Sequence, residues 1–379
     1  MSDPILENAY IERLVQGLPR SPLQLNRLQE ADAELIRLPG TTAVLALKTD
    51  SIVEEIETGL YADPYLLGWM TVTVNASDLA AVGAEPIGLL LNETLPPDPD
   101  DHYLTELQRG IRDACLEYRL PVLGGDTNFS THVQLGGFAL GLVPDGRPVT
   151  RVGCHPGDLL YASGPLGSGA AYALAVLGTE MSGAERPQYR PRARIREGVV
   201  LRPFASCCMD SSDGALPTLD QLARLNRVGF RIDSRLEDVL DSSAQRVATG
   251  FAPWMLLAGP HGEFELLFTV PPDRRAAFES AAAAASWTPL RLGLATAETA
   301  VCLTYQGANV PVDTARVRNL FSSVGGDVPE YVRGLFEIDA TMRHAMGRSA
   351  DGEVSDSPCS PRFHAGGQSS ETSSRSWIG

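Results

Sequence analysis

The chain has 379 residues, of which 44% are hydrophobic and 21% are charged. This length exceeds the roughly 100–200 residues of one ordinary domain, so we expect a globular protein of two domains. The formal net charge of -16 argues against a nucleic-acid or anionic-membrane partner, because phosphate-rich surfaces attract basic patches. It leaves open the binding of one nucleotide, since divalent cations can bridge carboxylates to phosphates.

The sequence shows neither a membrane span nor a secretion signal. No stretch approaches the ~20 apolar residues that cross a bilayer. The first residues, MSDPILENAY, carry acidic side chains where a signal peptide has basic ones. The six cysteines match no zinc-binding spacing. We therefore expect reduced thiols and a cytoplasmic location.

Strands and helices alternate in the first half of the chain. Residues 1–40 look helical and then irregular. A helix is predicted from Asp63-Pro64 to about Gly83, because Asp63 can cap free N–H groups and proline suits the first helical position. An amphipathic helix is expected at 101–119. The strands predicted from short apolar runs are 43–49, 86–95, 120–125 and 133–143.

The turn PDGRP at 144–148 separates the two halves. We place an N-terminal α/β domain at 1–148 and a C-terminal α+β domain at 149–322, followed by a helix at 323–347. Residues 348–379 are rich in Ser and Gly and poor in aliphatic side chains, which predicts a disordered tail. The second domain is expected to contain helices at 167–177, near 197–206, from 214 and at 275–286, and strands at 158–164, 229–233, 264–270 and finally 289–294.

Six aspartates stand out by their sequence context. They are Asp32, Asp50, Asp78, Asp126, Asp210 and Asp213. Asn75 and Asp78 are three positions apart on a predicted helix, so both can face one site. Carboxylates are hard oxygen ligands that suit Mg²⁺, and neighbouring glycines let the backbone approach a phosphate closely. Taken singly, each aspartate is more often a helix cap or a turn residue, so it is the joint pattern that predicts a metal and phosphate site.

Seven segments resemble a known superfamily in sequence and in order. They are KTDSIVEE, VNASDLAAVGAEP, LGGDTN, GRPVTRVGCHPGDLLYASGPLGSGAA, RPRARIREGVVL, DSSDGALPTLDQLA and GEFELLFTVP. The superfamily includes aminoimidazole ribonucleotide synthetase, thiamine-monophosphate kinase, selenophosphate synthetase and the hydrogenase maturation protein that makes cyanide. The chain is most similar to thiamine-monophosphate kinase. The resemblance implies ATP and several Mg²⁺ ions as cofactors.

The same resemblance implies a fold and roles for individual residues. The N-terminal strands would pair across a homodimer into a barrel, and the C-terminal domain would cover the nucleotide. The six aspartates would hold metal ions, and the catalytic roles would fall to Asp126 and Asp213. Contacts to the nucleotide or to its metals would come from Thr49, Gly125, Asp126, Arg151 and Ser212.

The chain departs from the thiamine-monophosphate kinase pattern chiefly at substrate-side positions. Ala31 replaces the first of two adjacent aspartates, which leaves Asp32 as the remaining ligand there. Glu57 stands where the kinase has a substrate-contacting histidine, and Gly262 where it has a substrate-contacting glutamate. Residues 313–321 contain no tryptophan, which the kinase has at this position. The residues that we expect beside the substrate are Glu57, His261 and Glu263.

Three functions fit these observations. The first is Mg²⁺-dependent transfer of the γ-phosphoryl group of ATP to a small molecule other than thiamine monophosphate, because ATP-side positions are kept and substrate-side positions are changed. The second is an ATP-dependent ligase or cyclase, in which ATP activates a carbonyl or amide oxygen. The third is a nucleotide-binding protein without catalysis, which the changes at Ala31 and Gly262 would suit. The retained aspartates favour an enzyme, and we expect a cytoplasmic homodimer that acts on a small molecule.

Overall fold

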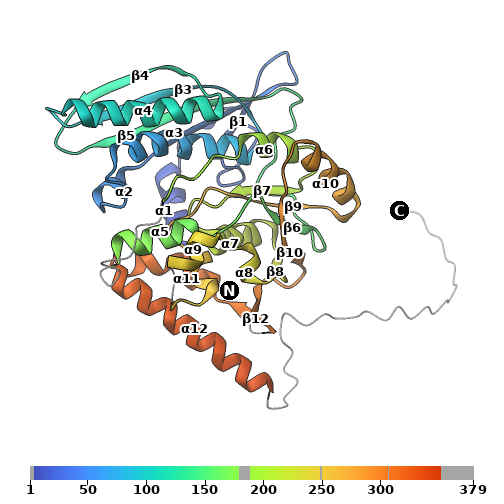
Figure 1. Cartoon of the computed structure of the whole chain (residues 1–379). Coiled ribbons are helices and arrows are strands. Elements are labelled where there is room, and N and C mark those ends of the chain that lie inside the picture. Colours follow the sequence, from blue (N-terminus) through green and yellow to red (C-terminus); the bar gives the residue numbers. More distant parts are fainter. Residues whose placement is uncertain (1–3, 179–187, 248–249, 306, 351–379) are drawn as a thin grey trace, which may run out of the picture.

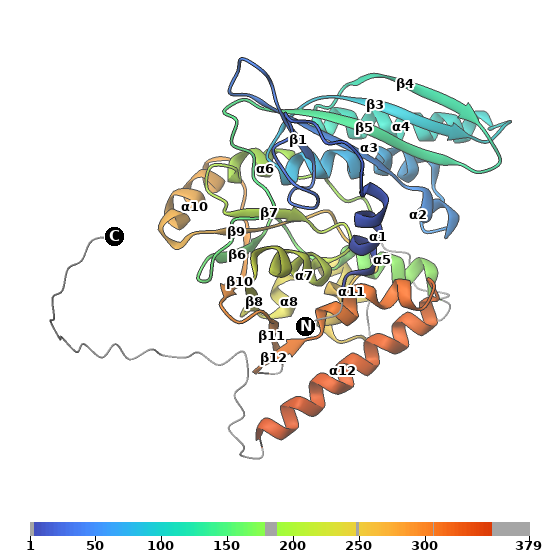
Figure 2. The same ribbon diagram turned by 180° about the vertical axis from the view of Figure 1, so that it is seen from behind.

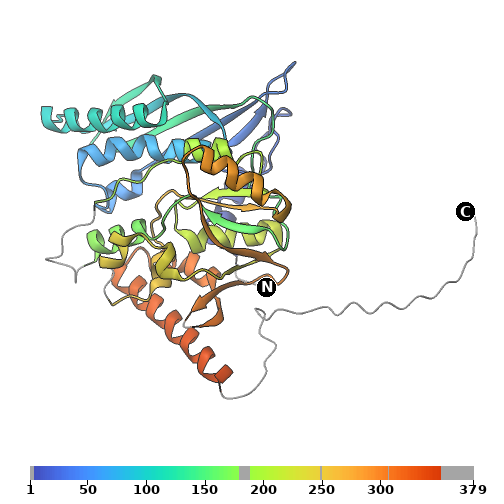
Figure 3. The same ribbon diagram turned by 45° about the vertical axis from the view of Figure 1, so that its right-hand side comes forward.

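The computed structural model describes residues 4–178, 188–247, 250–305 and 307–350. The chain forms two β-sheets that lie one above the other, with helices between and around them (Figures 1 and 3). From residue 351 onward, the predicted disordered tail lies outside the described residues.

The first sheet is built by the N-terminal half of the chain. Its strand order is β1-β2-β5-β3-β4, and neighbouring strands are antiparallel except β3 and β4, which run parallel. All residues of β4 are exposed, so the sheet ends on an uncovered edge strand. The strands are β1 (Glu34–Arg37), β2 (Val44–Ser51), β3 (Glu85–Leu95), β4 (Val122–Phe129) and β5 (Gln134–Val143).

Two long helices lie on one side of this sheet. α3 (Pro64–Ala81) packs against β2 and β5, and α4 (Asp101–Tyr118) packs along α3 (Figure 1). The start of α3 confirms the prediction, because the Asp63 side chain accepts a hydrogen bond from the Tyr65 N–H at 3.1 Å and proline occupies the first turn. The short helix α2 (Val53–Glu57) follows β2. Since α3 is buried over almost its whole length, the polar side chains near its C-terminal end are held in the interior.

The C-terminal half forms the second sheet. Within the described residues, its order is β12-β11-β8-β10-β6-β9-β7, and the pairs are antiparallel except β8 with β11. The strands are β6 (Leu159–Ala162), β7 (Cys207–Asp210), β8 (Gly229–Ile232), β9 (Leu266–Val270), β10 (Leu290–Thr296), β11 (Val301–Tyr305) and β12 (Ala308–Val312). The helices are α5 (Ser168–Leu177), α6 (Ile195–Leu201), α7 (Ala215–Asn226), α8 (Leu236–Val239), α9 (Ser242–Val247), α10 (Arg275–Ala284), α11 (Thr314–Ser323) and α12 (Val328–Ala350).

α3 also connects the two halves. It contacts β7 and α6, and the indole N–H of Trp69 donates to the Pro191 carbonyl at 2.7 Å. A Cβ on Gly198 of α6 would lie 2.1 Å from the Ala80 carbonyl oxygen, so the two helices touch at backbone distance. Trp69 shares one hydrophobic core with Phe268 of β9. Residues of both sheets are therefore held at fixed positions beside α3.

Some elements differ from those expected. Residues 1–40 contain a helix, α1 (Leu6–Val15), but also β1, whose four residues are too few to show an alternating pattern. The hairpin of β11 and β12 and the helix α11 follow the strand at 289–294, which was expected to be the last strand. α1 lies beside α7 and α11 (Figure 2), where the Asn8 side chain donates to Gln221 at 2.8 Å and the Asn319 side chain donates to the Pro4 carbonyl at 3.0 Å.

The expectation for the cysteines is partly wrong. Cys302 is disulfide-bonded. The sequence does not show this, because disulfide pairing depends on which side chains the fold brings together and not on sequence spacing. The free thiols among the described residues are Cys115, Cys154, Cys207 and Cys208. No helix in the described part of the chain is long and apolar enough to span a membrane.

Candidate metal centre

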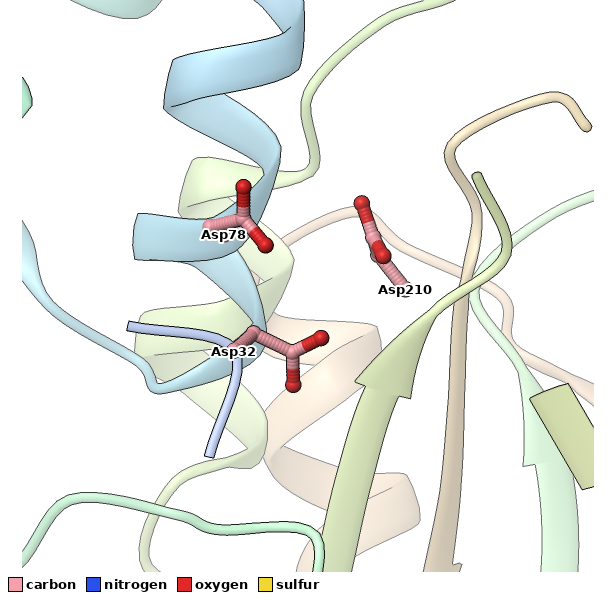
Figure 4. A group of neighbouring side chains, drawn as sticks. All are labelled: Asp32, Asp78 and Asp210. Carbon is pink, nitrogen blue, oxygen red and sulfur yellow. The ribbon is translucent and has the colours of Figure 1, made fainter. Parts of the chain in front are cut away.

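Three aspartates from distant parts of the sequence meet between the two sheets (Figure 4). Asp32 comes from the segment before β1, Asp78 from α3 and Asp210 from the end of β7. Each offers a carboxylate oxygen within 4.8 Å of the other two, and all three residues are buried. These three predicted metal ligands form one group, which we call the aspartate cluster.

Hydrogen bonds between α3, β7 and α7 hold the cluster together. The hydroxyl of Ser77, the residue before Asp78, donates to Asp210 Oδ2 at 2.5 Å. The Thr218 hydroxyl of α7 donates to the Asp210 carbonyl at 3.1 Å. Because every residue of β7 is buried, the Asp210 carboxylate is surrounded by protein and faces α3.

Two cationic side chains face the aspartate cluster. The Arg151 guanidinium lies 2.8 Å from Asp32 Oδ1. The Lys48 ammonium lies 3.2 Å from Asp78 Oδ2 and 3.7 Å from Asp50 Oδ2. Arg151, which was expected to contact the nucleotide or its metals, therefore binds a cluster aspartate directly.

The cluster carboxylates resist ionisation in the absence of further positive charge. Burial raises the pKa of Asp210 to about 7, and the nearby charge of Asp32 adds to this effect. Burial also raises the pKa of Asp78, although Lys48 acts in the opposite direction. Carboxylates in such surroundings are stabilised in their charged form when a cation binds beside them.

The aspartate cluster suits a Mg²⁺ ion. Asp32 Oδ2 is buried and has no hydrogen-bond partner among the described residues. An oxygen in that position costs free energy unless a cation or a water molecule reaches it. Mg²⁺ prefers carboxylate oxygens and keeps several of its own waters. Asp32, Asp78 and Asp210 are therefore the residues that would hold the ion, which when bound would neutralise phosphate charge.

Asp50 lies at the rim of the cluster. Its backbone N–H donates to the Asn75 side chain at 3.0 Å, and its carbonyl accepts from the same side chain at 3.2 Å. The Asp50 side chain is 42% exposed, so it remains accessible to a ligand. Asn75 and Asp78 face one site, as expected, and Asn75 acts there by fixing the end of β2.

Thr49 and Asp126 point toward the uncovered face of the first sheet. Side chains alternate along a strand. Lys48 and Asp50 point toward the aspartate cluster, so Thr49, which lies between them, points away from it. Thr49 pairs with Phe138, and Phe138 pairs with Leu90. Asp126 pairs with Asn92, which is two residues after Leu90 and therefore on the same face.

Asp126 does not join the aspartate cluster within one chain. Two strands, β5 and β3, separate its strand from β2, so three strand spacings place it about 14 Å from Asp50. Its carboxylate accepts a hydrogen bond from the Asn128 side chain at 2.8 Å. A Cβ on the preceding Gly125 would lie 2.3 Å from the Leu91 carbonyl oxygen, so this glycine serves close strand packing. Strand order and alternation, which short motifs do not specify, account for this separation.

The loop between β7 and α7 carries the other predicted ligands. Asp213 is exposed and lies outside the aspartate cluster. Burial raises the pKa of Glu55 to about 7, and the charges of Asp50 and Asp213 add to the shift, so these three carboxylates face one region at the rim. The Ser212 carbonyl accepts the Gly262 N–H at 2.8 Å, which joins this loop to the segment before β9.

Two of the residues expected beside the substrate have opposite surroundings. Glu57 ends α2 and is exposed. His261 is buried, and its Nε2 lies 2.6 Å from the Tyr61 hydroxyl and 2.9 Å from the Tyr189 hydroxyl. Burial lowers the pKa of His261 to about 4, so its ring is neutral at pH 7. Of these two side chains, Glu57 is the one open to a ligand.

Glu263, the third such residue, is also buried. Its carboxylate accepts the Gly167 N–H at 2.8 Å and the Ser211 hydroxyl at 3.0 Å. Burial raises the pKa of Glu263 to about 8. The side chain thus joins the start of α5 to the loop after β7.

Sequence reasoning missed three contributors to this centre. Lys48 could have been found, because it lies two residues before Asp50 on a predicted strand and so shares its face. Ser77 gave no signal, since only the approach of β7 brings its hydroxyl to Asp210. Glu55 also gave none, because the charge of Asp213 that acts on it comes from a distant part of the chain.

A separate cavity of about 590 Å³ lies away from the aspartate cluster. It is lined by residues of α4, β3 and the edge strand β4, among them Ile111, Leu91 and Val122. The cavity therefore belongs to the outer edge of the first sheet.

Comparison with known proteins identifies the family. Residues 30–143 match the family described as AIR synthase related protein, N-terminal domain. The thiamine-monophosphate kinase of Escherichia coli K12 is 34% identical over 262 residues, which span 66% of this chain and 78% of that kinase. The chain belongs to the thiamine-monophosphate kinase family. It is accordingly an ATP-dependent kinase with ATP and Mg²⁺ as cofactors.

Solved structures agree with this membership in the thiamine-monophosphate kinase family. A structure of AaThiL complexed with AMPPCP and TMP is 25% identical and superposes with a TM-score of 0.65, covering 80% of this chain and 93% of that chain. A chain of the HypE-HypF complex is 16% identical and superposes with a TM-score of 0.65, covering 80% of this chain and 98% of that chain. The second likeness shows the fold alone. The expected superfamily and its mixed α/β fold with two sheets are confirmed.

Proposed function

We propose that this kinase transfers the γ-phosphoryl group of ATP to a small molecule other than thiamine monophosphate. The observation that carries the proposal is the packing of Gly262. A Cβ at this position would lie 1.6 Å from the Ser211 carbonyl oxygen, so the segment before β9 touches the loop after β7 backbone to backbone. This contact leaves no room for the substrate-contacting glutamate that the resemblance implies here.

The charge around the rim indicates the kind of acceptor that would bind there. Glu54 and Glu57 of α2 are exposed, and the charges of Asp50 and Asp213 act on Glu55. An acidic rim of this kind favours an acceptor that carries a cationic or hydrogen-bond-donating group. The histidine expected of the kinase pattern is replaced there by Glu57.

The residues around the cluster have the properties that phosphoryl transfer needs. ATP would lie with its phosphates toward the aspartate cluster, where Asp32, Asp78 and Asp210 would hold Mg²⁺. The N-terminal turn of α7 follows Asp213 and offers N–H groups to an anion. Phosphoryl transfer depends mainly on positioning and charge neutralisation, so no protein nucleophile is required.

We also propose that two copies of the chain pair through the uncovered face of the first sheet. On this face Leu90 and Phe138 are 42% and 36% exposed, and Leu123 of the edge strand is 55% exposed. Exposed apolar side chains beside an unpaired edge strand are typical of an association surface. In such a dimer Asp126 would act in the site of the partner subunit.

Two further proposals concern the whole chain. The division into 1–148 and 149–322 is supported by its position in the connection between β5 and β6, where one sheet ends and the other begins. The cytoplasmic location stays a prediction.

The acceptor is tested with ATP labelled at the γ-phosphate, Mg²⁺ and a panel of small metabolites that includes thiamine monophosphate. We expect label in a compound other than thiamine diphosphate, and no label with the Asp210→Asn variant. Thiamine monophosphate as the best acceptor of the panel would contradict the proposal. Release of free phosphate together with a dehydrated product or a new C–N bond would instead support the ligase or cyclase alternative.

A further inference from the structure

Lys48 places a positive charge inside the candidate metal centre. It lies on β2 two residues before Asp50, so both side chains point to the α3 side of the sheet. Its ammonium lies 3.2 Å from Asp78 Oδ2, within hydrogen-bonding distance, and 3.7 Å from Asp50 Oδ2. The charges of Asp32 and Asp210 also act on it. The Lys48 ammonium therefore lies where four carboxylates converge.

The Lys48 ammonium forms ion pairs with two of these carboxylates, those of Asp78 and Asp50. The side chain is 25% exposed, so it is enclosed mainly by protein. A lysine ammonium is a compact cation with three donors and can neutralise carboxylates without coordinating them as a metal does.

The charge balance of the centre shows what this lysine replaces. When all four are ionised, Asp32, Asp50, Asp78 and Asp210 bring four negative charges, whereas Lys48 and Arg151 bring two positive ones. The remaining difference equals the charge of one divalent cation. Without Lys48, the buried carboxylate of Asp78 would require a further cation beside it, because isolated buried charges are strongly disfavoured.

We propose that Lys48 is a protein-supplied cation that takes the place of one divalent ion between Asp50 and Asp78. The inference rests on the proposed function of the aspartate cluster as the Mg²⁺ and ATP site. The centre then binds one metal ion fewer than the same carboxylates could bind without Lys48. Part of it stays neutralised when all metal is removed, because an ammonium on the chain cannot be chelated.

The test counts Mn²⁺ ions bound per protomer by electron paramagnetic resonance, in the presence of a non-hydrolysable ATP analogue. Lys48→Met removes the charge at similar length, and Lys48→Arg keeps it as the matched control. We expect Lys48→Met to bind one more Mn²⁺ than the wild type, and Lys48→Arg to bind the same number as the wild type. An equal or smaller number in Lys48→Met would overturn the inference.

A second measurement covers the stability of the variant. In EDTA, the melting temperature of Lys48→Met should fall below that of the wild type, and added Mn²⁺ should restore it. A Lys48→Met protein that stays unfolded with Mn²⁺ would show that the lysine is needed for folding itself, and would overturn the inference. If the wild type binds Mn²⁺ but Lys48→Met binds no additional Mn²⁺ ion, the proposed function stands and only the role proposed for Lys48 is overturned. If the wild type binds none, the proposed function fails and this inference fails with it.

Discussion

Ser77 lies behind the metal ligands and orients one of them. Its hydroxyl donates to Asp210 Oδ2 at 2.5 Å in a buried setting, so it fixes the carboxylate that would face the ion. Such supporting groups commonly change metal affinity by roughly 10–100-fold when they are removed. We therefore predict a loss of that size in the Mg²⁺ affinity of Ser77→Ala, measured from the Mg²⁺ dependence of ATP turnover.

The control for Ser77 is a serine that is remote from the centre. The Ser234 hydroxyl donates to the Arg291 carbonyl at 2.7 Å at an exposed position, so Ser234→Ala should leave the Mg²⁺ affinity unchanged. Equal Mg²⁺ affinities in the two variants would show that Ser77 does not orient Asp210.

Glu263 should make the stability of the fold depend on pH. Burial raises its pKa from 4.5 to about 8, so between these values the folded state binds a proton that the unfolded state releases. The stability contributed by this group is full below pH 4.5 and is lost as the pH rises toward 8. Glu263→Gln removes this titration, and the fall in the free energy of unfolding between pH 5 and 8 should become shallower.

Denaturant unfolding at a series of pH values measures this effect. The exposed Glu57 provides the control, and Glu57→Gln should keep the wild-type slope. A Glu263→Gln protein with the wild-type slope or a steeper one would contradict the assignment of a raised pKa to Glu263.

At the level of single residues, the sequence could predict the ligand types but only part of their arrangement. Asp32, Asp78 and Asp210 do form one cluster. Asp126 lies across the sheet, because strand order separates residues whose motifs look equivalent. His261 was expected beside the substrate, yet its ring is buried between two tyrosines, a placement that depends on contacts between distant segments.

Among the elements, α3 has the largest effect on the site, because it carries Asn75, Ser77 and Asp78. It packs on α4 through two glycines. A Cβ on Gly68 would lie 2.0 Å from the Leu107 carbonyl oxygen, and a Cβ on Gly110 would lie 2.1 Å from the Tyr65 carbonyl oxygen. Backbone atoms cannot move away by a change of rotamer as a side chain can, so any residue larger than glycine at these positions must push the two helices apart.

Gly110→Ala should therefore destabilise the protein. Alanine favours a helix over glycine by about 1 kcal/mol, but overpacking against a backbone carbonyl typically costs about 1–3 kcal/mol, so the net change is a loss. The loss is measured as the free energy of unfolding in urea. Gln108→Ala, at an exposed position of the same helix, should change it by less than about 0.5 kcal/mol. A Gly110→Ala protein as stable as Gln108→Ala would show that the helices are not in backbone contact.

Helices and strands that are marked by residues within their own segment could be predicted from the sequence. The cap and proline of α3 and the long apolar run of β5 gave such signals. β1 and β7, each four residues long, are strands because neighbouring strands accept their hydrogen bonds, and sequences this short carry little periodicity. Asp210 precedes the helix predicted from 214, as the sequence indicates, but it also ends β7, a strand that was not predicted, and this strand brings it to α3.

In the whole molecule, the position of Asp126 decides whether a complete site requires two chains. If Asp126 serves the partner subunit, Asp126→Asn and Asp78→Asn should each be inactive alone. Mixed dimers of the two should contain one intact site. An equal mixture should recover roughly a quarter of wild-type activity, because half of the dimers are mixed and each has one complete site of two.

The matched control mixes Asp78→Asn with Asp210→Asn, whose changes both fall in the same cluster, and it should recover no activity. ATP turnover after co-expression or joint refolding measures the effect. Recovery no greater than in this control would contradict a site shared between subunits, as would full activity of Asp126→Asn alone.

The proposed kinase activity requires the aspartate cluster to be the Mg²⁺ and ATP site. The direct test is a calorimetric titration of Mg²⁺ into the protein with a non-hydrolysable ATP analogue, for the wild type and for Asp32→Asn, Asp78→Asn and Asp210→Asn. We predict saturable Mg²⁺ binding to the wild type and an affinity at least about tenfold weaker in each variant, with circular dichroism showing that each variant keeps the fold. Wild-type affinity in all three variants would contradict this prediction.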